Sequence, residues 1–257
     1  MWTLESQLPV PCWRRRDSAA GVRLGFSTRR GGVSPPPYDS LNLGRSTADR
    51  PESVVENRAR FLRQLGADPS RLVTVGQVHG PGVAVATAPG FHPERDAVVS
   101  QVPGLILAVS SADCLPILLV ARGREGPAVA AVHAGWRGSA DGIALAALRV
   151  LNEQLGAGAA MLTAHLGPCI RQCCYQVGPE VAARFSPDHV ATRGGSRYLD
   201  FPAAIRRQLI EAGVPPGSIE DTGACTACEP HWYFSHRRDR GITGRHWGVI
   251  GLDALPA

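Results

Sequence analysis

Three side chains that bind transition metals each follow a short apolar run of the sequence. His79, Cys114 and His133 come where an expected strand ends, each in a turn of small residues. Two imidazoles and one thiolate form a three-ligand zinc set whose fourth position stays open, as in catalytic rather than structural sites. Separations of 35 and 19 residues match no short metal-binding motif. The grouping therefore depends on strands that bring the three turns together.

The segment around His133 has the most detailed local pattern. Residues 128–132 are small or β-branched and predict a buried strand, and the glycines that flank Trp136 and Arg137 predict a tight turn. Ser139 is the expected N-cap of a helix that ends at Gly156. An arginine near a strand end and a helix N-terminus is typical of anion sites in α/β proteins. The alternative is an ordinary capped turn with a surface histidine.

Further groups are suited to binding a phosphate or a sugar hydroxyl. Arg29 and Arg30 stand in an arginine-glycine turn, and Asn42 lies in the proline-rich segment 34–44, which we expect to be a surface loop. Gln77 lies two residues before His79. We take these four residues as candidates for substrate binding.

The catalytic candidates are Arg137, Arg238 and Asp113. The two arginines lie in turn motifs and can clamp an anion, although each is individually typical of a protein surface. Asp113 precedes Cys114 and is a candidate acid or base. A role for Asp113 as a turn or cap residue is the favoured alternative. The H-x-E and P-C-x-x-C signature of zinc deaminases is absent.

The composition excludes two kinds of chemistry. All 27 basic residues are arginine, so no lysine is present for a Schiff base or a Walker-type phosphate loop. The net charge of +5 is spread along the chain. It fits anionic small substrates as well as nucleic acid, and we expect no nucleic-acid partner.

Seven cysteines and the N-terminal sequence bear on the compartment. We find no apolar segment typical of a secretory signal, so we expect reduced cysteines and a soluble, cytoplasmic protein. The apolar stretch GLILAVSSADCLPILLVA is interrupted by Asp113 and Pro116 and predicts two strands around a turn rather than a membrane helix.

Hydrophobic patterning predicts an α/β protein without internal repeats or a linker, and we expect one domain over residues 1–257. Segment 186–197 is expected to be irregular. Besides the helix after Ser139, helices are expected at 52–65, 179–185 and 202–212. Strands are expected at 21–28, 72–75, 83–86, 96–100, 105–109, 115–121, 128–132, 161–166, 219–222, 231–236 and 247–252.

Six segments occur in a characteristic order: GQVHG, SADCLPILL, AVHAGWRG, GPCI followed by CCYQVG, CTAC, and FSHRRD followed by TGR. Together they resemble the YfiH family, also called the laccase-domain or multicopper polyphenol oxidase family, whose members are described as purine nucleoside phosphorylases. The resemblance runs from TRRGG at 28–32 to the GVIGL strand, nearly the whole chain. His236 and Gln176 replace a common tyrosine and glutamate, which bears on substrate preference.

The resemblance implies a zinc ion bound by His79, Cys114 and His133. It implies one α/β domain, built as a layered α-β-β-α sandwich with mixed sheets. It also implies phosphorolysis of adenosine, inosine, guanosine and methylthioadenosine, with adenosine deamination as a side activity. The partners are then purine nucleosides and inorganic phosphate, and we expect a monomer or weak dimer without membrane attachment.

Other functions compete with this one. A multicopper laccase needs many histidines, whereas this chain has eight, no H-x-H pair, and only Met1 and Met161 as axial methionine candidates. Weak polyphenol oxidation by adventitious copper remains an alternative. Another is a cysteine hydrolase that uses Cys114 as nucleophile and His133 as base, for example in editing peptidoglycan precursors.

A zinc-stabilised binding module is the alternative without catalysis. It predicts a closed site in which Cys225 or Cys228 joins the three ligands. The CTAC segment that contains both cysteines has no second C-x-x-C partner, so we interpret it as a turn with two packed thiols.

Overall fold

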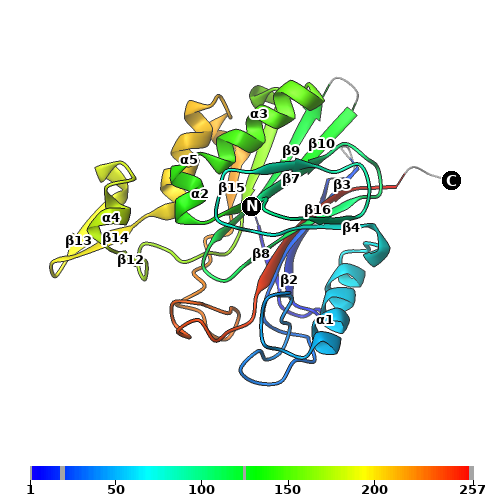
Figure 1. The fold of residues 1–257 in the computed structure, drawn as a ribbon, viewed down its shortest axis with the longest axis horizontal. Coiled ribbons are helices and arrows are strands. Elements are labelled where there is room, and N and C mark those ends of the chain that lie inside the picture. The colour runs from blue at the N-terminus through cyan, green and yellow to red at the C-terminus, as the bar shows by residue number, and fades with distance from the viewer. Residues whose placement is uncertain (1, 18–20, 124–125, 255–257) are drawn as a thin grey trace.

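The computed structural model describes residues 2–17, 21–123 and 126–254. Two mixed sheets pack face to face, with α1 outside one sheet and α3 and α5 outside the other (Figure 1). The predicted α-β-β-α sandwich with mixed sheets is therefore confirmed. The helices that cover the outer faces are α1 (Pro51–Gln64), α3 (Ile143–Leu155) and α5 (Phe201–Glu211).

The first sheet has the strand order β1-β2-β3-β16-β8-β4-β6, antiparallel as far as β8 and parallel beyond it. Strands β8 and β4 are adjacent and parallel, so the segments that follow them, which carry Cys114 and His79, leave the sheet at the same end. The strands are β1 (Leu4–Glu5), β2 (Cys12–Asp17), β3 (Val22–Ser27), β16 (His246–Leu252), β8 (Ile106–Ser111), β4 (Leu72–Val75) and β6 (Gly90–His92).

The second sheet has the order β15-β11-β9-β10-β7-β5, with parallel pairs at both ends and antiparallel pairs between them. Its parallel pair β15–β11 places the segments that follow these two strands next to each other. The strands are β15 (Ile219–Asp221), β11 (Leu162–Leu166), β9 (Leu115–Gly123), β10 (Gly126–Ala134), β7 (Ala97–Ser100) and β5 (Val83–Val85).

The central strands are apolar on both faces because both faces are covered. On β9, Ile117 and Leu119 pack toward the α3 layer, whereas Leu118 and Val120 pack against the first sheet. This arrangement explains why the run from 115 to 121 shows no alternation of polar and apolar residues. It also confirms that the apolar stretch around Cys114 forms two strands, β8 and β9. None of the helices formed by the described residues is long and apolar enough to cross a membrane.

The helix after His133 differs from its predicted start. Residues Trp136–Ala140 form a short helix, α2, that contains Ser139, and α3 begins only after Gly142 at φ 83°. Ser139 is therefore not the N-cap, because the left-handed glycine breaks the chain into two helices. The predicted stop at Gly156 is confirmed, with φ 62° at the C-cap.

Two other expectations about secondary structure are wrong. Residues 186–197 are not irregular throughout: β13 (Val190–Arg193) and β14 (Ser196–Leu199) form a hairpin across Gly194 and Gly195, and β12 (Gln176–Val177) joins them in a third sheet (Figure 1). Residues 231–236 form turns and an irregular segment rather than a strand. Their aromatic residues reflect burial, since Tyr233 and Phe234 are both fully enclosed. The remaining helix, α4 (Pro179–Ala182), is shorter than predicted.

Candidate active site

His79, Cys114 and His133 meet in the folded chain. Their ligand atoms all lie within 4.8 Å of one another, and we call them the His–Cys–His cluster. His79 lies in the loop after β4, Cys114 in the turn between β8 and β9, and His133 near the end of β10. The two imidazole rings are 4.9 Å apart between centroids. The cluster can hold a metal ion through two nitrogens and one sulfur.

Asp96 orients this cluster, a role that no sequence pattern indicates beyond its place at the start of an expected strand. The carboxylate is fully buried and accepts hydrogen bonds from the backbone N–H groups of Val78, His79 and Gly80 at 2.9–3.0 Å. It also bonds the Nδ1 atom of His133 at 2.8 Å. The other ring nitrogen of His133, Nε2, is thereby left to face a metal.

Gly135 leaves the space that the cluster needs. A Cβ atom at this position would lie 2.5 Å from Nδ1 of His79 and 3.4 Å from the sulfur of Cys114. Any side chain here would push the histidine out of place. The glycine after His133 is therefore explained by close approach rather than by a positive φ angle.

Charge within the cluster favours a thiolate. Burial alone would raise the pKa of the Cys114 thiol, but the charge of His133 and hydrogen bonds from His133 and His79 outweigh it and lower the pKa to about 6. Burial would likewise lower the pKa of His133, but the Cys114 thiolate and Asp96 raise it to about 9. A thiolate is the protonation state in which cysteine binds metals or acts as a nucleophile.

The cluster opens into a cavity of about 740 Å³. Its charged lining is strongly cationic, because Asp113 is the one carboxylate among the described lining residues, against the arginines Arg45, Arg137, Arg237 and Arg245. Burial lowers the pKa of Arg245 from its usual value. The cavity is thus suited to an anion, and Arg45, Arg237 and Arg245 are lining residues that were not among the sequence candidates.

The same cavity offers flat apolar surfaces. Phe91, Trp136, Tyr175 and Phe201 line it together with His236. Guanidinium groups lie over three of these rings: Arg45 over Phe91 at 4.5 Å, Arg237 over Tyr175 at 5.5 Å and Arg137 over Trp136. Aromatic faces of this kind bind planar heterocycles by stacking. Their side chains come from segments far apart in sequence, so spacing could not have identified them.

Arg137 lies on α2 and lines this cavity. Its guanidinium stacks on its neighbour Trp136, 4.4 Å from the ring centroid. Asp141, one helical turn after Arg137, pairs with Arg184 at 2.7 Å, and no ion pair joins it to Arg137 among the described residues. Arg137 is exposed and is therefore accessible to a ligand in the cavity.

Asp113 anchors the turn that carries Cys114. Its carboxylate accepts hydrogen bonds from the hydroxyls of Thr226 and Ser235, at 2.6 and 3.1 Å, and from the backbone N–H of Arg237 at 2.7 Å. Asp113 has φ 88°, a backbone conformation that residues other than glycine rarely adopt. These contacts agree with the role of a turn residue that we favoured from the sequence.

The other candidates lie in more structural settings. Gln77 lines the cavity, but its amide exchanges two hydrogen bonds with the backbone of Ser110. Asn42 is fully buried, bonds Thr47, Asp49 and backbone groups, and is not among the described residues that line this cavity. Residues 41–44 of its segment are buried, whereas Pro36, Pro37 and Asp39 are exposed, so the predicted surface loop covers only the first part of the segment. The guanidinium of Arg238 is held by Asp239 and by two carbonyl groups.

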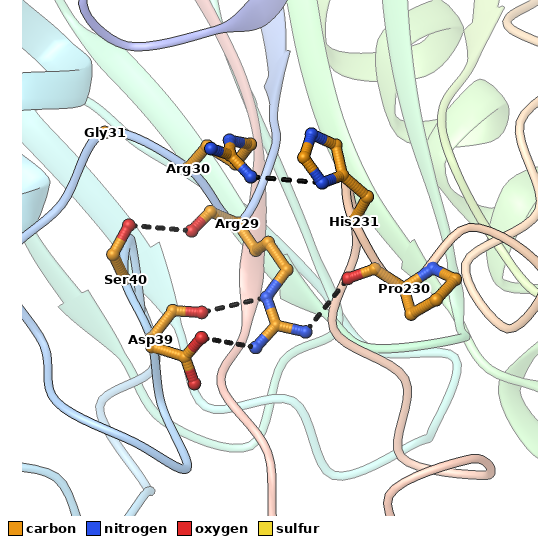
Figure 2. A pocket seen from close by; sticks show the side chains of 7 residues that line it. All are labelled: Arg29, Arg30, Gly31, Asp39, Ser40, Pro230 and His231. Atoms are coloured by element: carbon orange, nitrogen blue, oxygen red, sulfur yellow. Dashed lines mark hydrogen bonds and ion pairs between the residues drawn. The ribbon is translucent and has the colours of Figure 1, made fainter.

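Arg29 and Arg30 line a separate cavity of about 390 Å³, which shares no lining residue with the first (Figure 2). The guanidinium of Arg29 bonds the backbone and carboxylate of Asp39 and the carbonyl of Pro230. Arg30 contacts His231 at 3.2 Å. The structure thus does not bring these two arginines to the His–Cys–His cluster.

The binding-module alternative predicts that Cys225 or Cys228 joins the His–Cys–His cluster, but neither of them does. They lie with Cys173 and Cys174, all four sulfurs within 4.8 Å of one another. The interpretation of CTAC as a turn with two packed thiols was therefore incomplete.

The fold and site define a mixed α/β protein in which two histidines and one cysteine line a cationic, aromatic cavity. The family described as multi-copper polyphenol oxidoreductase laccase matches residues 23–253, and the chain belongs to this family. A relative from Streptomyces coelicolor, named purine nucleoside phosphorylase, is 42% identical over 93% of this chain and 99% of its own. YfiH of Escherichia coli carries the same name and is 41% identical over 96% and 99% of the two chains.

Solved structures agree with this assignment. The crystal structure of the Bacillus licheniformis hypothetical protein YfiH is 31% identical, with a TM-score of 0.89 over 97% of this chain and 98% of that one. YlmD from Geobacillus stearothermophilus is 34% identical, with a TM-score of 0.88 over 94% and 96%. The resemblance to the YfiH family is thus confirmed in both sequence and fold.

Proposed function

We propose that the protein is a zinc-dependent purine nucleoside phosphorylase. The observation that carries the proposal is the 740 Å³ cavity, because it joins a possible metal site to four arginines and four aromatic rings. Relatives named purine nucleoside phosphorylases, about two-fifths identical to this chain, support the same reaction. The proposed substrates are adenosine, inosine, guanosine and methylthioadenosine, together with inorganic phosphate.

Phosphorolysis requires phosphate close to the anomeric carbon and stabilisation of the charge that develops in the transition state. We assign phosphate binding to Arg137, with Arg237 and Arg245 as further donors. Arg237 is held in place by its own bonds to Gln176 and Asp113. Asp113 is then a positioning residue, since its oxygens already accept three hydrogen bonds. The aromatic side chains would bind the purine by stacking and limit the access of water.

The donor set fits zinc. His79, Cys114 and His133 supply two nitrogens and a sulfur with a low pKa, and Asp96 fixes the ring of His133 in the way that metal-binding histidines usually require. When bound, zinc supplies Lewis-acid polarisation and acidification of water. A side activity as an adenosine deaminase belongs to this proposal, whereas copper is not expected to be the native metal.

A nucleoside panel tests the proposed function. Purified protein is incubated with each nucleoside, with and without phosphate, and chromatography detects the free base. We expect release of adenine or hypoxanthine that depends on phosphate. Base release at the same rate without phosphate would indicate hydrolysis, and absence of release from every purine nucleoside would contradict the proposal.

A cysteine hydrolase that acts on peptidoglycan precursors is the second candidate. The observation in its favour is the thiolate–imidazolium pair of Cys114 and His133, whose pKa values are about 6 and about 9. The two functions need the same atoms in different states. Metal-free protein that hydrolyses a peptidoglycan precursor and rapidly loses this activity on treatment with iodoacetamide would favour the hydrolase.

A further inference from the structure

Four cysteines outside the candidate active site converge at one edge of the second sheet. Cys173 and Cys174 lie in the turn after β11, and Cys225 and Cys228 lie in the turn after β15. Because β11 and β15 are adjacent and parallel, the two turns leave the sheet at the same end. The chain therefore brings together residues more than 50 positions apart, and we call them the four-cysteine cluster.

The sulfur atoms of this cluster are spaced for a single ion. The distance is 3.5 Å from Cys173 to Cys225, 3.3 Å from Cys173 to Cys228 and 3.2 Å from Cys174 to Cys228. Zinc–sulfur bonds of about 2.3 Å place the sulfurs of a tetrahedral site about 3.8 Å apart. A modest expansion of the cluster thus accommodates zinc, whereas a disulfide needs sulfurs about 2.05 Å apart.

The backbone around the cluster is already fixed. Arg171 forms an ion pair with Asp221 and donates to the carbonyl of Ala224, which ties the first turn to the second. Cys169 and Thr226 extend the link through backbone hydrogen bonds. The backbone N–H groups of Arg171 and Cys228 also donate to the sulfur of Cys225. Such donors stabilise the negative charge of a zinc–thiolate centre.

We propose that Cys173, Cys174, Cys225 and Cys228 bind a structural zinc ion. The C-x-x-C pair of the second turn supplies two ligands, and the adjacent cysteines of the first turn supply the other two. Four thiolates complete a tetrahedral site and leave no open position for substrate. The site is separate from the His–Cys–His cluster and does not depend on the proposed reaction.

This zinc would brace one wall of the 740 Å³ cavity. Ile170 and Tyr175, on either side of the first cysteine pair, line the cavity. On the second turn, Thr226 follows Cys225 and donates to Asp113, next to Cys114. Loss of the four-cysteine cluster should therefore loosen the cavity wall without removing any ligand of the His–Cys–His cluster.

Metal analysis of the whole protein, purified with reductant and without metal-affinity resin, tests the proposal. We expect two zinc ions per chain in the wild type and one in the Cys173→Ser/Cys228→Ser variant. Cys114→Ala should lose the other ion, and Cys12→Ala, which changes a cysteine outside both clusters, should keep two. X-ray absorption at the zinc edge of Cys114→Ala should show sulfur neighbours alone at about 2.3 Å.

Cobalt replacement provides a readout that does not require the double variant to fold. The wild-type protein loaded with Co²⁺ should show thiolate-to-cobalt charge-transfer absorption. Cys228 is exposed, and the single variant Cys228→Ser should reduce this absorption sharply. Equal zinc content in the wild type and Cys173→Ser/Cys228→Ser would overturn the proposal. So would a stable disulfide among the four cysteines in freshly purified protein, with no zinc bound by sulfur in Cys114→Ala.

Discussion

The two clusters of metal-binding side chains differ in almost every respect that separates catalytic from structural sites. The His–Cys–His cluster has three mixed ligands, opens into a cavity and is backed by the buried carboxylate of Asp96. The four-cysteine cluster has four identical ligands and joins two turns at a sheet edge. An open coordination position serves chemistry, whereas a closed one serves stability. The comparison predicts that changes to the two clusters have separable effects.

The largest effect on activity is expected from Cys114→Ala. Removing the thiolate should eliminate the metal of the His–Cys–His cluster and slow phosphorolysis about a thousand-fold, since Lewis-acid stabilisation contributes several kcal/mol. Zinc analysis and steady-state kinetics measure both losses in the same preparation. Unchanged zinc in a folded Cys114→Ala protein would break the assignment of this cluster as a metal site.

Asp96→Asn should give the next largest effect. Asparagine keeps the size of the side chain but offers one oxygen where the carboxylate accepts three backbone hydrogen bonds and contacts His133. Metal affinity or activity should fall about 10- to 100-fold, the usual effect of losing the partner of a metal-binding histidine. Asp253→Asn, which breaks surface ion pairs with Arg16 and Arg23, is the matched control. Zinc binding measured in competition with a chelator distinguishes the two variants, and similar affinities would contradict the role of Asp96.

Arg137→Ala should act on phosphate more than on metal. Losing one charge-assisted hydrogen bond costs about 1.5–3 kcal/mol, so the KM for phosphate should rise at least about ten-fold while zinc content stays unchanged. Arg184→Ala, which removes an exposed arginine from the pair with Asp141, provides the control. The assignment fails if Arg137→Ala keeps the phosphate dependence of the wild type. A joint loss of zinc and thermal stability would instead indicate that Arg137 only braces the loop.

The sequence contained enough information to group the three side chains of the first cluster but not to predict the residues around them. His79, Cys114 and His133 are recognisable because each follows a strand and stands in a family motif. Asp96 has no such context, since its role depends on the fold bringing the loop after β4 and the end of β10 to one carboxylate. Likewise, adjacency of β11 and β15, not spacing, creates the four-cysteine cluster. These contacts are long-range and leave no local pattern.

Local signals also competed with one another. Gly194 and Gly195, between VATR and SRYL, are a hairpin signal that could have revealed β13 and β14. By contrast, the aromatic run at 231–236 favours a strand, yet Tyr233 and Phe234 are buried in an irregular segment. High β-propensity there reflects packing rather than backbone conformation. Arg237 lines the cavity while its neighbour Arg238 is held by Asp239, a distinction that no sequence pattern can make.

The stability of the fold at low pH bears on the comparison of the two clusters, because unfolding of the whole chain would affect both clusters at once. His165 on β11 packs edge-on against Trp2, and its ring centroid lies 5.4 Å from that of the indole. Burial is the main cause that lowers its pKa to about 4 from 6.5, against the attraction of Glu220 and together with the repulsion of Arg15. The folded chain therefore keeps His165 neutral at a pH where the unfolded chain would protonate it.

The sign of the effect follows from this difference in pKa. Above pH 6.5 neither state binds the proton, so the free energy of unfolding is unaffected; between pH 6.5 and 4 the unfolded state binds more protons and stability falls. The total loss should be on the order of 3 to 4 kcal/mol, at about 1.4 kcal/mol per unit of pKa. Urea unfolding at several pH values measures it, and His165→Phe should flatten the curve in this window. Equal slopes for the wild type and His165→Phe would show that another group controls acid unfolding. If zinc is lost at a higher pH than the one at which the chain unfolds, the loss arises in the clusters themselves and not from unfolding.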